Sequence, residues 1–405
     1  MKPRVLMIAY ACNPEGSGEH WLGWGWAEQA AKNFSVDLIT TTNASAAVEK
    51  NARTLGITPH FVGTPTWWRK LTDLTGTSWL RKLSWQRRTF GLAKTLHARQ
   101  QFDVVHQTTF HTFRVPFLAA GLGIPSVWGP IAGGERVPSG FEGYLGPARG
   151  AESRRQTLNW FSLRVPAVKR SLENARTLFV SNRTTLDFLP EMARAKAQIV
   201  PPNALKPQDE LFSGPGAKGN TGPLRLLYIG NCVATRSVPL VLDALKVSGL
   251  KDYEFKIIGD GPALEEWRQR TAQLGLADRV KFLGKIPYTL LTDHYSAADA
   301  LVFPALRDSG GSALLEAMAR YLPVICLDWA GPGEMVDEKS GIKISATSPT
   351  ETVKAFAAAL NRLKAEPDWR ESLAKAARTR ALEKFRWEAK REILEVTYRK
   401  LMGQP

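Results

Sequence analysis

Short apolar runs alternate with helical segments along the whole chain, and this alternation restricts the possible folds more than any other feature. Apolar runs of about 4 to 8 residues are typical of strands buried on both faces, and helices between such strands favour parallel sheets. The predicted strands of the first half lie near Arg4–Tyr10, Val36–Thr40, His60–Val62, Val104–His106, Ser126–Trp128, Thr177–Ser181 and Gln198–Pro201. Those of the second half lie near Leu224–Ile229, Phe255–Ile258, Val280–Leu283, Ala300–Phe303 and Val324–Leu327.

The segment Gly214–Pro223 separates the two series of strands. It is rich in Gly and Pro and has no hydrophobic pattern, which is typical of a linker. A chain of 405 residues is long enough for two domains with separate cores. We therefore predict an α/β protein with an N-terminal domain, a linker, a C-terminal domain and a final helix, at residues 1–205, 206–223, 224–384 and 385–405.

Composition restricts the location and the partners. No apolar run approaches the length of about 18 residues that a membrane-spanning helix needs. The apolar run after Met1 is too short for a signal sequence, and the three scattered cysteines offer neither a disulfide framework nor metal-ligand spacing. These features predict a cytoplasmic protein. Its net charge of +16 indicates either a solvated basic surface or an anionic partner.

Residues 303–318 combine a strand end, a Gly-rich turn and a helix start. Asp308 lies in the turn and Glu316 two turns into the helix, so both carboxylates are predicted to point toward the carboxyl edge of the sheet. The turn from Ser309 through Gly310, Gly311 and Ser312 would present backbone N–H groups there, where a helix N-terminus attracts phosphate. Hydroxyl acceptors beside a phosphate cradle suit a nucleotide-sugar. An ordinary strand–turn–helix is the alternative interpretation.

This passage resembles the signature of retaining glycosyltransferases of family 4. Their usual form is Glu-Gly-Phe-Gly, four residues, then Glu-Ala-Met-Ala; here the segment 308–311 reads Asp-Ser-Gly-Gly, and Glu316 keeps the spacing. The resemblance implies the GT-B fold, two Rossmann-like domains with parallel sheets facing across a cleft. Further landmarks are Val200–Asn203, Tyr228–Gly230 followed by Arg236, Ile258–Pro262, Val280–Gly284, and Phe385–Trp387 before a last helix that crosses back to the N-terminal domain.

The resemblance also assigns roles to residues of the second half. Transfer from a nucleotide-sugar leaves a diphosphate, which fixed positive groups must stabilise. The family places an Arg and a Lys after the first strand of the C-terminal domain, and these positions hold Asn231 and Arg236. Glu316 is expected to bind ribose hydroxyls and Asp308 the transferred sugar. No Asp-x-Asp occurs, so we expect a metal-independent reaction without a cofactor. We favour same-face transfer, in which a donor phosphate oxygen takes the proton of the acceptor.

In the first half, the loop after the first strand holds Gly18, Glu19 and His20. Its Gly-x-Gly could indicate a dinucleotide site, but the second predicted strand does not end in the acidic residue that NAD requires. The resemblance places this loop near the donor phosphate and the acceptor, so Gly18 is a donor-binding candidate and Glu19 and His20 are acceptor candidates. Helix capping is an equal alternative for Glu19.

A strand-end histidine and a glutamate on a Gly-Gly turn complete the predicted site. His106 ends a predicted strand and would contact the sugar from a cleft; a structural histidine is the alternative. Glu135 follows a Gly-Gly turn and is predicted to orient the acceptor.

Four other classes of protein are alternatives to a transferase. A nucleic-acid-binding protein would show a recognisable basic and aromatic module, and none is found, so we predict no nucleic-acid partner. A non-catalytic nucleotide-sugar or glycan-binding protein, a GT-B epimerase and a phosphorylase remain open.

Residues 64–100 carry eight Lys or Arg and one acid, a net charge of +7, with Trp67, Trp68, Trp79 and Trp85 interleaved. Cationic and aromatic residues together suit the headgroup layer of an anionic membrane. A core-packed helix with a solvated face is the alternative. We predict a peripheral enzyme at the inner face of the cytoplasmic membrane, which acts on a glycan or lipid-linked acceptor in polysaccharide or lipopolysaccharide synthesis.

Overall fold

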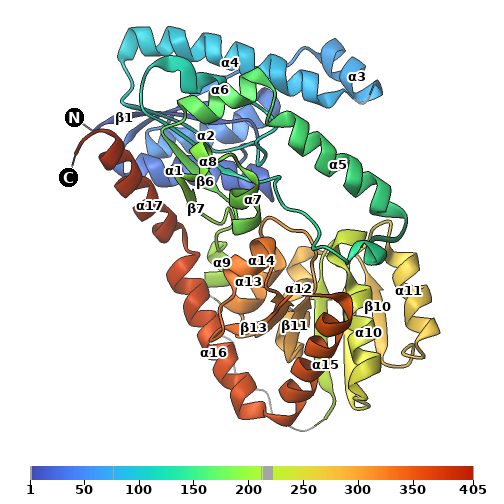
Figure 1. Cartoon of the computed structure of the whole chain (residues 1–405). Coiled ribbons are helices and arrows are strands. Elements are labelled where there is room, and N and C mark those ends of the chain that lie inside the picture. The colour runs from blue at the N-terminus through green and yellow to red at the C-terminus, as the bar shows by residue number, and fades with distance from the viewer. Residues whose placement is uncertain (1, 76, 211, 213–221, 405) are drawn as a thin grey trace. The chain divides into compact units, whose positions relative to one another are not determined.

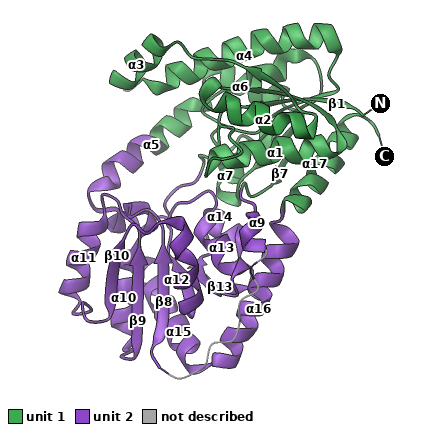
Figure 2. Cartoon of the chain, turned by 180° about the vertical axis from the view of Figure 1, so that it is seen from behind, with its two compact units in different colours: residues 1–134, 156–202, 387–405 green, residues 135–155, 203–386 purple. Residues whose placement is uncertain are grey.

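The computed structural model of the chain describes residues 2–75, 77–210, 212 and 222–404. The chain forms two compact units (Figures 1 and 2). Unit 1 contains residues 1–134, 156–202 and 387–405, and unit 2 contains residues 135–155 and 203–386. Helix α5 (Arg149–Ser162) contributes residues to both units.

Unit 1 is built around a parallel sheet with the strand order β3-β2-β1-β4-β5-β6-β7. Its strands are β1 (Arg4–Ala9), β2 (Ser35–Thr40), β3 (Thr58–Phe61), β4 (Val104–Gln107), β5 (Ser126–Ile131), β6 (Thr177–Val180) and β7 (Ala197–Ile199). Its α-helices are α1 (Glu19–Asn33), α2 (Ser45–Leu55), α3 (Thr66–Leu74), α4 (Ser78–Gln100), the end of α5, α6 (Pro166–Asn174), α7 (Arg183–Phe188), α8 (Glu191–Arg194) and α17 (Trp387–Leu401).

The last helix of the chain packs on the first helix of unit 1. The ring of Trp387 at the start of α17 fills the space beside Gly25 in α1, where an added Cβ would lie only 1.9 Å from a ring atom. Glycine at position 25 therefore permits the contact between α1 and α17.

Unit 2 contains a second parallel sheet, with the order β10-β9-β8-β11-β12-β13. Its strands are β8 (Leu224–Ile229), β9 (Tyr253–Ile258), β10 (Val280–Gly284), β11 (Ala300–Phe303), β12 (Val324–Leu327) and β13 (Gly341–Ile344). Its helices are η3 (Glu142–Ala148), the start of α5, α9 (Pro207–Glu210), η4 (Ala234–Arg236), α10 (Val238–Ser248), α11 (Leu264–Gln273), η5 (Tyr288–Leu290), α12 (Leu291–Ala297), α13 (Ser312–Ala319), α14 (Ala330–Met335), α15 (Pro349–Ala365) and α16 (Pro367–Lys384).

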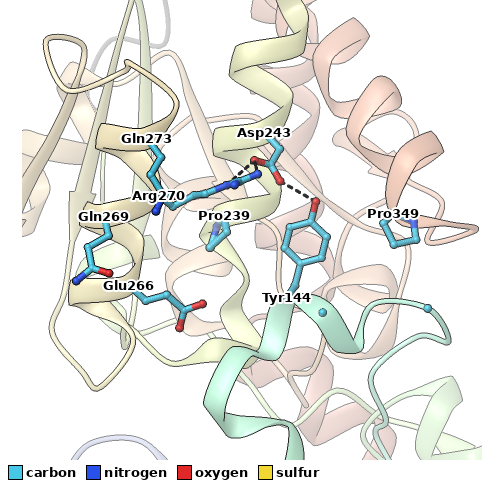
Figure 3. A pocket seen from close by; sticks show the side chains of 10 residues that line it. Tyr144, Pro239, Asp243, Glu266, Gln269, Arg270, Gln273 and Pro349 are labelled. Atoms are coloured by element: carbon cyan, nitrogen blue, oxygen red, sulfur yellow. Dashed lines mark hydrogen bonds and ion pairs between the residues drawn. The ribbon is translucent and has the colours of Figure 1, made fainter.

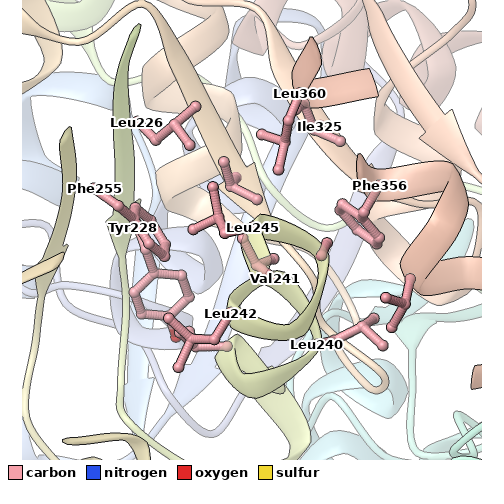
Figure 4. Packing of buried hydrophobic residues seen from close by; sticks show 14 of the residues in the cluster. Leu226, Tyr228, Leu240, Val241, Leu242, Leu245, Phe255, Ile325, Phe356 and Leu360 are labelled. Atoms are coloured by element: carbon pink, nitrogen blue, oxygen red, sulfur yellow. The ribbon is translucent and has the colours of Figure 1, made fainter. Parts of the chain in front are cut away.

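Helix α10 lies in the hydrophobic core of unit 2, between the sheet and α15 (Figure 4). Its sequence is apolar on almost every side, which fits a helix that is covered on both faces. Phe255 from the sheet and Phe356 from α15 are fully buried in the same cluster as Leu242. Each such side chain contributes about 1.5–3 kcal/mol through burial.

The predicted alternation of strands and helices is confirmed. All twelve predicted strands are present, with ends that differ by three residues at most. Strand β13 was not predicted, because Gly341–Ile344 is short and alternates apolar and polar residues. Instead of lying within one domain at 1–205, residues 135–155 and 203–205 belong to unit 2. Most of the predicted linker 206–223 lies outside the described residues.

Both sheets contain a topological switch point. In unit 2 the chain passes from β8 to β9 on one side, and β11 then pairs with β8 on the other side. Loops that follow strands at such a point diverge and leave room for a ligand at the carboxyl edge of the sheet. The loops after β8 and β11 are therefore the candidate ligand-binding region of unit 2.

Candidate active site

The loops that follow β8 and β11 are joined at the switch point of unit 2. The backbone N–H of Leu306 donates to the carbonyl oxygen of Thr235 (2.9 Å). This contact fixes η4, which carries Arg236, beside the turn that carries Asp308. Two residues that the sequence separates widely are thereby brought to one point.

Arg236 and Asp308 form an ion pair through Nη1 and Oδ2. The guanidinium carbon of Arg236 also lies 5.0 Å from the ring centre of Phe303, the last residue of β11. Burial opposes the positive charge, but the carboxylate of Asp308 outweighs it, so the pKa of Arg236 is raised. The predicted phosphate cation and the predicted sugar ligand are thus direct partners.

The N–H groups at the start of α13 have protein acceptors. Gly310 donates to Oδ1 of Asp308 (3.2 Å). With its side-chain oxygen turned toward α13, Asn203 accepts from Gly311 (3.1 Å) and Ser312 (3.2 Å). A phosphate at the predicted cradle would therefore have to displace a carboxylate or an amide. Ser309 is half-buried in the same turn, and the side chain of Ser312 is exposed.

Glu316 is buried in α13 and has two polar neighbours. The hydroxyl of Tyr295 donates to its Oε2 (2.9 Å), and Nζ of Lys206 lies 3.9 Å from its Oε1. Burial raises the pKa of Glu316, and the positive charge of Lys206 acts in the opposite direction. Oε2 is occupied by the hydrogen bond from Tyr295, whereas the contact of Oε1 with Lys206 is longer and involves a flexible side chain. Oε1 is therefore the better candidate to bind a ligand.

Sequence reasoning missed Lys206 and Tyr288. The Lys206 ammonium lies 3.8 Å from the ring centre of Tyr288, and the Tyr288 hydroxyl donates to Oδ1 of Asp209 (3.4 Å). Lys206 follows the Val200–Asn203 landmark by three residues, and this was the one signal available in the sequence. Its charge adds a cation beside Glu316.

Asn231, the other predicted donor-binding residue after β8, is exposed. Its backbone carbonyl accepts a hydrogen bond from the Tyr228 hydroxyl (3.0 Å). The neutral side chain of Asn231 supplies no charge to the site.

In unit 1, the loop after β1 is fixed to the loop after β4. Oε1 of Glu19 accepts from the backbone N–H of His111 (2.9 Å), so this carboxylate has a structural partner. Gly18 precedes α1 with φ of 56°, a backbone conformation that glycine adopts most readily. His20 is exposed on the first turn of α1.

The prediction that His106 contacts the sugar was wrong. His106 is fully buried in unit 1: its Nδ1 lies 2.5 Å from the Tyr398 hydroxyl, and its Nε2 lies 2.7 Å from the Gly129 carbonyl oxygen. Burial lowers the pKa of His106 to about 4, so the ring is neutral, with Nε2–H donating and Nδ1 accepting. His106 is the structural histidine of the alternative interpretation.

Glu135 lies in unit 2 rather than in the predicted first domain, and it is buried. The guanidinium of Arg155 donates to the carbonyl oxygen of Glu135 and pairs with the carboxylate of Glu152 (2.7 Å). Glu152 also lies 3.1 Å from Nε of Arg307, the residue before Asp308. The segment 135–155 therefore reaches the β11 loop.

The same segment packs along the helices of unit 2. Phe141 and Leu145 are buried in its core, and the Tyr144 hydroxyl donates to Asp243 (2.8 Å), which also pairs with Arg270 (Figure 3). A pocket of about 500 Å³ lies between η3, α10 and α11. It contains none of the predicted site residues.

The basic segment 64–100 forms α3 and α4, and its two halves differ. Trp85 of α4 is fully buried, and the face of α4 that carries Trp85 and Ala93 packs on the core of unit 1. This agrees with the core-packed alternative. The exposed large apolar side chains lie on α3 and at the start of α4: Trp67, Leu71, Leu74 and Trp79. Among the described residues, no helix combines the length and apolar character needed to cross a bilayer.

Two family models match the chain. Residues 22–203 match the Glycosyl transferase 4-like domain, and residues 216–380 match the family Glycosyl transferases group 1. An α-D-kanosaminyltransferase of Streptomyces kanamyceticus is 27% identical over 44% of this chain and 45% of its own length. A D-inositol 3-phosphate glycosyltransferase of Geodermatophilus obscurus is 32% identical over 43% of this chain and 39% of its own length. The chain thus spans less than half of these relatives.

Solved structures share the whole fold at low sequence identity. The lipopolysaccharide outer core galactosyltransferase WaaB has a TM-score of 0.64 at 14% identity, over 97% of this chain and 98% of that chain. Anabaena HepE in complex with UDP and glucose has a TM-score of 0.62 at 14% identity, over 98% of this chain and 100% of that chain. The chain is therefore built from the two family domains of a glycosyltransferase, and its fold is GT-B.

Proposed function

We propose that this protein is a retaining, metal-independent glycosyltransferase that moves a sugar from a nucleotide-sugar to a glycan or lipid-linked acceptor. The observation that carries the proposal is the pairing of Arg236 with Asp308 at the switch point of unit 2. A guanidinium suits the diphosphate of such a donor, and a carboxylate suits the hydroxyls of its sugar. Glu316, eight residues after Asp308, supplies an acceptor for the ribose.

The charges of the site support a definite sequence of events. When the donor binds, Arg236 exchanges the carboxylate of Asp308 for the diphosphate, and Asp308 becomes available to the sugar. The bond between the anomeric carbon and the phosphate oxygen then breaks, and its electron pair goes to the diphosphate. The acceptor hydroxyl attacks on the same face, and its proton passes to a diphosphate oxygen. Arg236 stabilises the charge that develops on the leaving group.

The names of similar proteins indicate which donor and acceptor to test first. Anabaena HepE was solved with UDP and glucose, and WaaB is named as a lipopolysaccharide galactosyltransferase. We therefore propose a UDP-sugar as the first donor to try, and a role in cell-surface polysaccharide or lipopolysaccharide synthesis.

We also propose that α3 and the start of α4 touch an anionic membrane. Trp67 and Leu74 are 67% and 87% exposed, and the exposed cations Arg69 and Lys70 lie beside them on α3. Exposed apolar side chains next to cations match the headgroup layer of a bilayer. Two other cations of the segment have protein partners: Arg81 pairs with Asp73 (2.5 Å), and Arg88 donates to the carbonyl oxygen of Gly63. The docking surface is therefore smaller than residues 64–100.

A thermal-shift series with UDP, GDP, ADP and an oligonucleotide tests the class of ligand. A ligand that binds only the folded state raises the Tm. One nucleoside diphosphate should raise the Tm of the wild type, and the oligonucleotide should not. A shift with the oligonucleotide alone would overturn the proposal. If a nucleoside diphosphate raises the Tm but no nucleotide-sugar is turned over, the protein is a non-catalytic binding protein and the transferase proposal is wrong.

A further inference from the structure

Arg307 lies beside Arg236 at the switch point of unit 2, although no motif marks it. The backbone N–H of Arg307 donates to the carbonyl oxygen of Thr235 (3.3 Å), the residue before Arg236. The two arginines therefore come from the two loops that meet there, and Asp308 follows Arg307 directly.

The side chain of Arg307 is oriented by an ion pair. Its Nε lies 3.1 Å from Oε2 of Glu152, and Glu152 is in turn held by Arg155 through Nε (2.9 Å) and Nη2 (2.7 Å). Despite this ion pair, the buried Nε–H of Arg307 makes no hydrogen bond among the described residues. The ion pair with Glu152 orients the guanidinium but leaves its hydrogen-bonding capacity incompletely used.

The carboxylates near Arg307 do not fully compensate the burial and the positive charges around it. Burial, and then the positive charge of Arg155, lower the pKa of Arg307, and Arg236 acts in the same direction; Glu152 and Glu135 oppose them without cancelling them. The positive charges of Arg155 and Arg236 therefore both disfavour the charged form of Arg307. A bound anion would offset that effect.

We propose that Arg307 is a second diphosphate-binding residue, which acts with Arg236 as a two-arginine clamp on the donor. This inference rests on the proposed function of the β8 and β11 loops. Because Asn231 is neutral, the β8 loop offers the diphosphate one cation, Arg236, at the two positions where the family has two. Arg307 supplies the second cation from the β11 loop. Each guanidinium can bind phosphate oxygens with two parallel N–H donors, which an ammonium cannot do. Glu152 is the positioning residue that orients Arg307.

Isothermal titration calorimetry of the whole protein tests the clamp, with UDP, GDP, ADP and inorganic diphosphate as probes. One nucleoside diphosphate should bind the wild type. Arg307→Ala and Arg236→Ala should each lower the affinity for that nucleotide by about tenfold or more. Arg307→Lys should lose less, because it keeps the charge without the fork. The control is Arg268→Ala, which removes an exposed arginine of α11 from the same unit and should bind like the wild type. If Arg307→Ala is unfolded by circular dichroism, Arg307→Gln takes its place.

The outcomes separate this inference from the proposed function. If Arg236→Ala lowers the nucleotide affinity and Arg307→Ala does not, the two-arginine clamp is wrong and the proposed function still stands. Diphosphate binding that requires Arg307, without binding of any nucleotide, would support the anion site and overturn the function. Binding of neither probe by the wild type would overturn both.

Discussion

Arg236 and Asp308 lie 72 residues apart in the chain and form an ion pair between the loops that follow β8 and β11. Both side chains are partly buried, so each compensates the charge of the other where water does so incompletely. A donor with a negative diphosphate and a sugar rich in hydroxyls can satisfy both groups at once. Replacement of either residue therefore also changes the state of its partner.

Loss of Arg236 or Glu316 should weaken donor binding. Arg236→Ala removes a cation from the diphosphate, and Glu316→Ala removes an acceptor from the ribose. Each should cost about 1.5–3 kcal/mol of binding free energy for the nucleoside diphosphate. Calorimetry measures this, with Arg268→Ala as the control. If both variants keep wild-type affinity, the donor site does not lie in unit 2.

Asp308→Asn should lower kcat more than nucleotide affinity. The amide keeps the size but loses the charge and one acceptor, and Arg236 is released from its ion pair. We expect a fall in kcat of about tenfold or more with unchanged or tighter binding of the nucleoside diphosphate. Asp278→Asn, an exposed carboxylate of the same unit, is the control. An unchanged kcat would restrict Asp308 to a structural role in the turn.

The reaction should survive excess EDTA. In the proposed mechanism guanidinium groups stabilise the leaving diphosphate, and no step assigns this task to a divalent ion. Initial rates are compared in EDTA and in Mg²⁺ or Mn²⁺. Full loss of activity in EDTA, restored by a divalent ion, would contradict the metal-free proposal.

Membrane binding should depend on α3. Co-sedimentation with phosphatidylglycerol vesicles should exceed that with phosphatidylcholine vesicles and should fall with salt. Neutralising Arg69 and Lys70 to Gln should weaken binding by about 2 kcal/mol at low salt, and Trp67→Gln should weaken it further. Lys169→Gln with Arg170→Gln removes two exposed cations of the same unit and is the control. No binding to anionic vesicles at low salt would favour a soluble acceptor.

His106 should make the stability of unit 1 depend on pH. The pKa of His106 is lowered to about 4 in the folded state, from 6.5 without the fold. The unfolded state therefore binds more protons between these values, and stability is lost as the pH falls from 6.5 to 4. The loss should approach about 3 kcal/mol.

Urea unfolding at pH 7.5 and pH 4.5 checks this contribution. His106→Gln should lose less stability over this interval than the wild type, and His294→Gln, in unit 2, should lose as much as the wild type. An equal loss for His106→Gln and the wild type would show that His106 does not titrate differently on folding.

Local patterns were sufficient to predict twelve of the strands described and the organisation into two parallel-sheet units. A buried strand such as Ala300–Phe303 is apolar along its own length, so its neighbours in sequence reveal it. The burial of His106 could not be predicted in this way. Its partner Tyr398 lies 292 residues away, and nothing near position 106 indicates that α17 will cover it.

The position of Arg307 next to the β8 loop also depends on a contact between residues that are distant in the sequence. Arg307 is one of many arginines in a basic chain, and its hydrogen bond to Thr235 forms only because β8 and β11 are neighbours in the sheet. Likewise Phe141 and Leu145 are apolar residues that could pack on either unit. Their place in unit 2 is decided by the packing of the whole segment 135–155, which a local pattern does not contain.

Turnover of a nucleotide-sugar by the purified protein tests the central claim most directly. A panel of UDP-, GDP- and ADP-sugars is followed by ¹H NMR, which reports release of the nucleoside diphosphate and the anomeric configuration of the sugar first released or transferred. One donor should be consumed with retention of configuration, and Arg236→Ala should lower the rate by about tenfold or more. An inverted first product would contradict retention. A rate that is unchanged in Arg236→Ala, or the absence of turnover with every donor and acceptor tried, would contradict catalysis at the β8 and β11 loops.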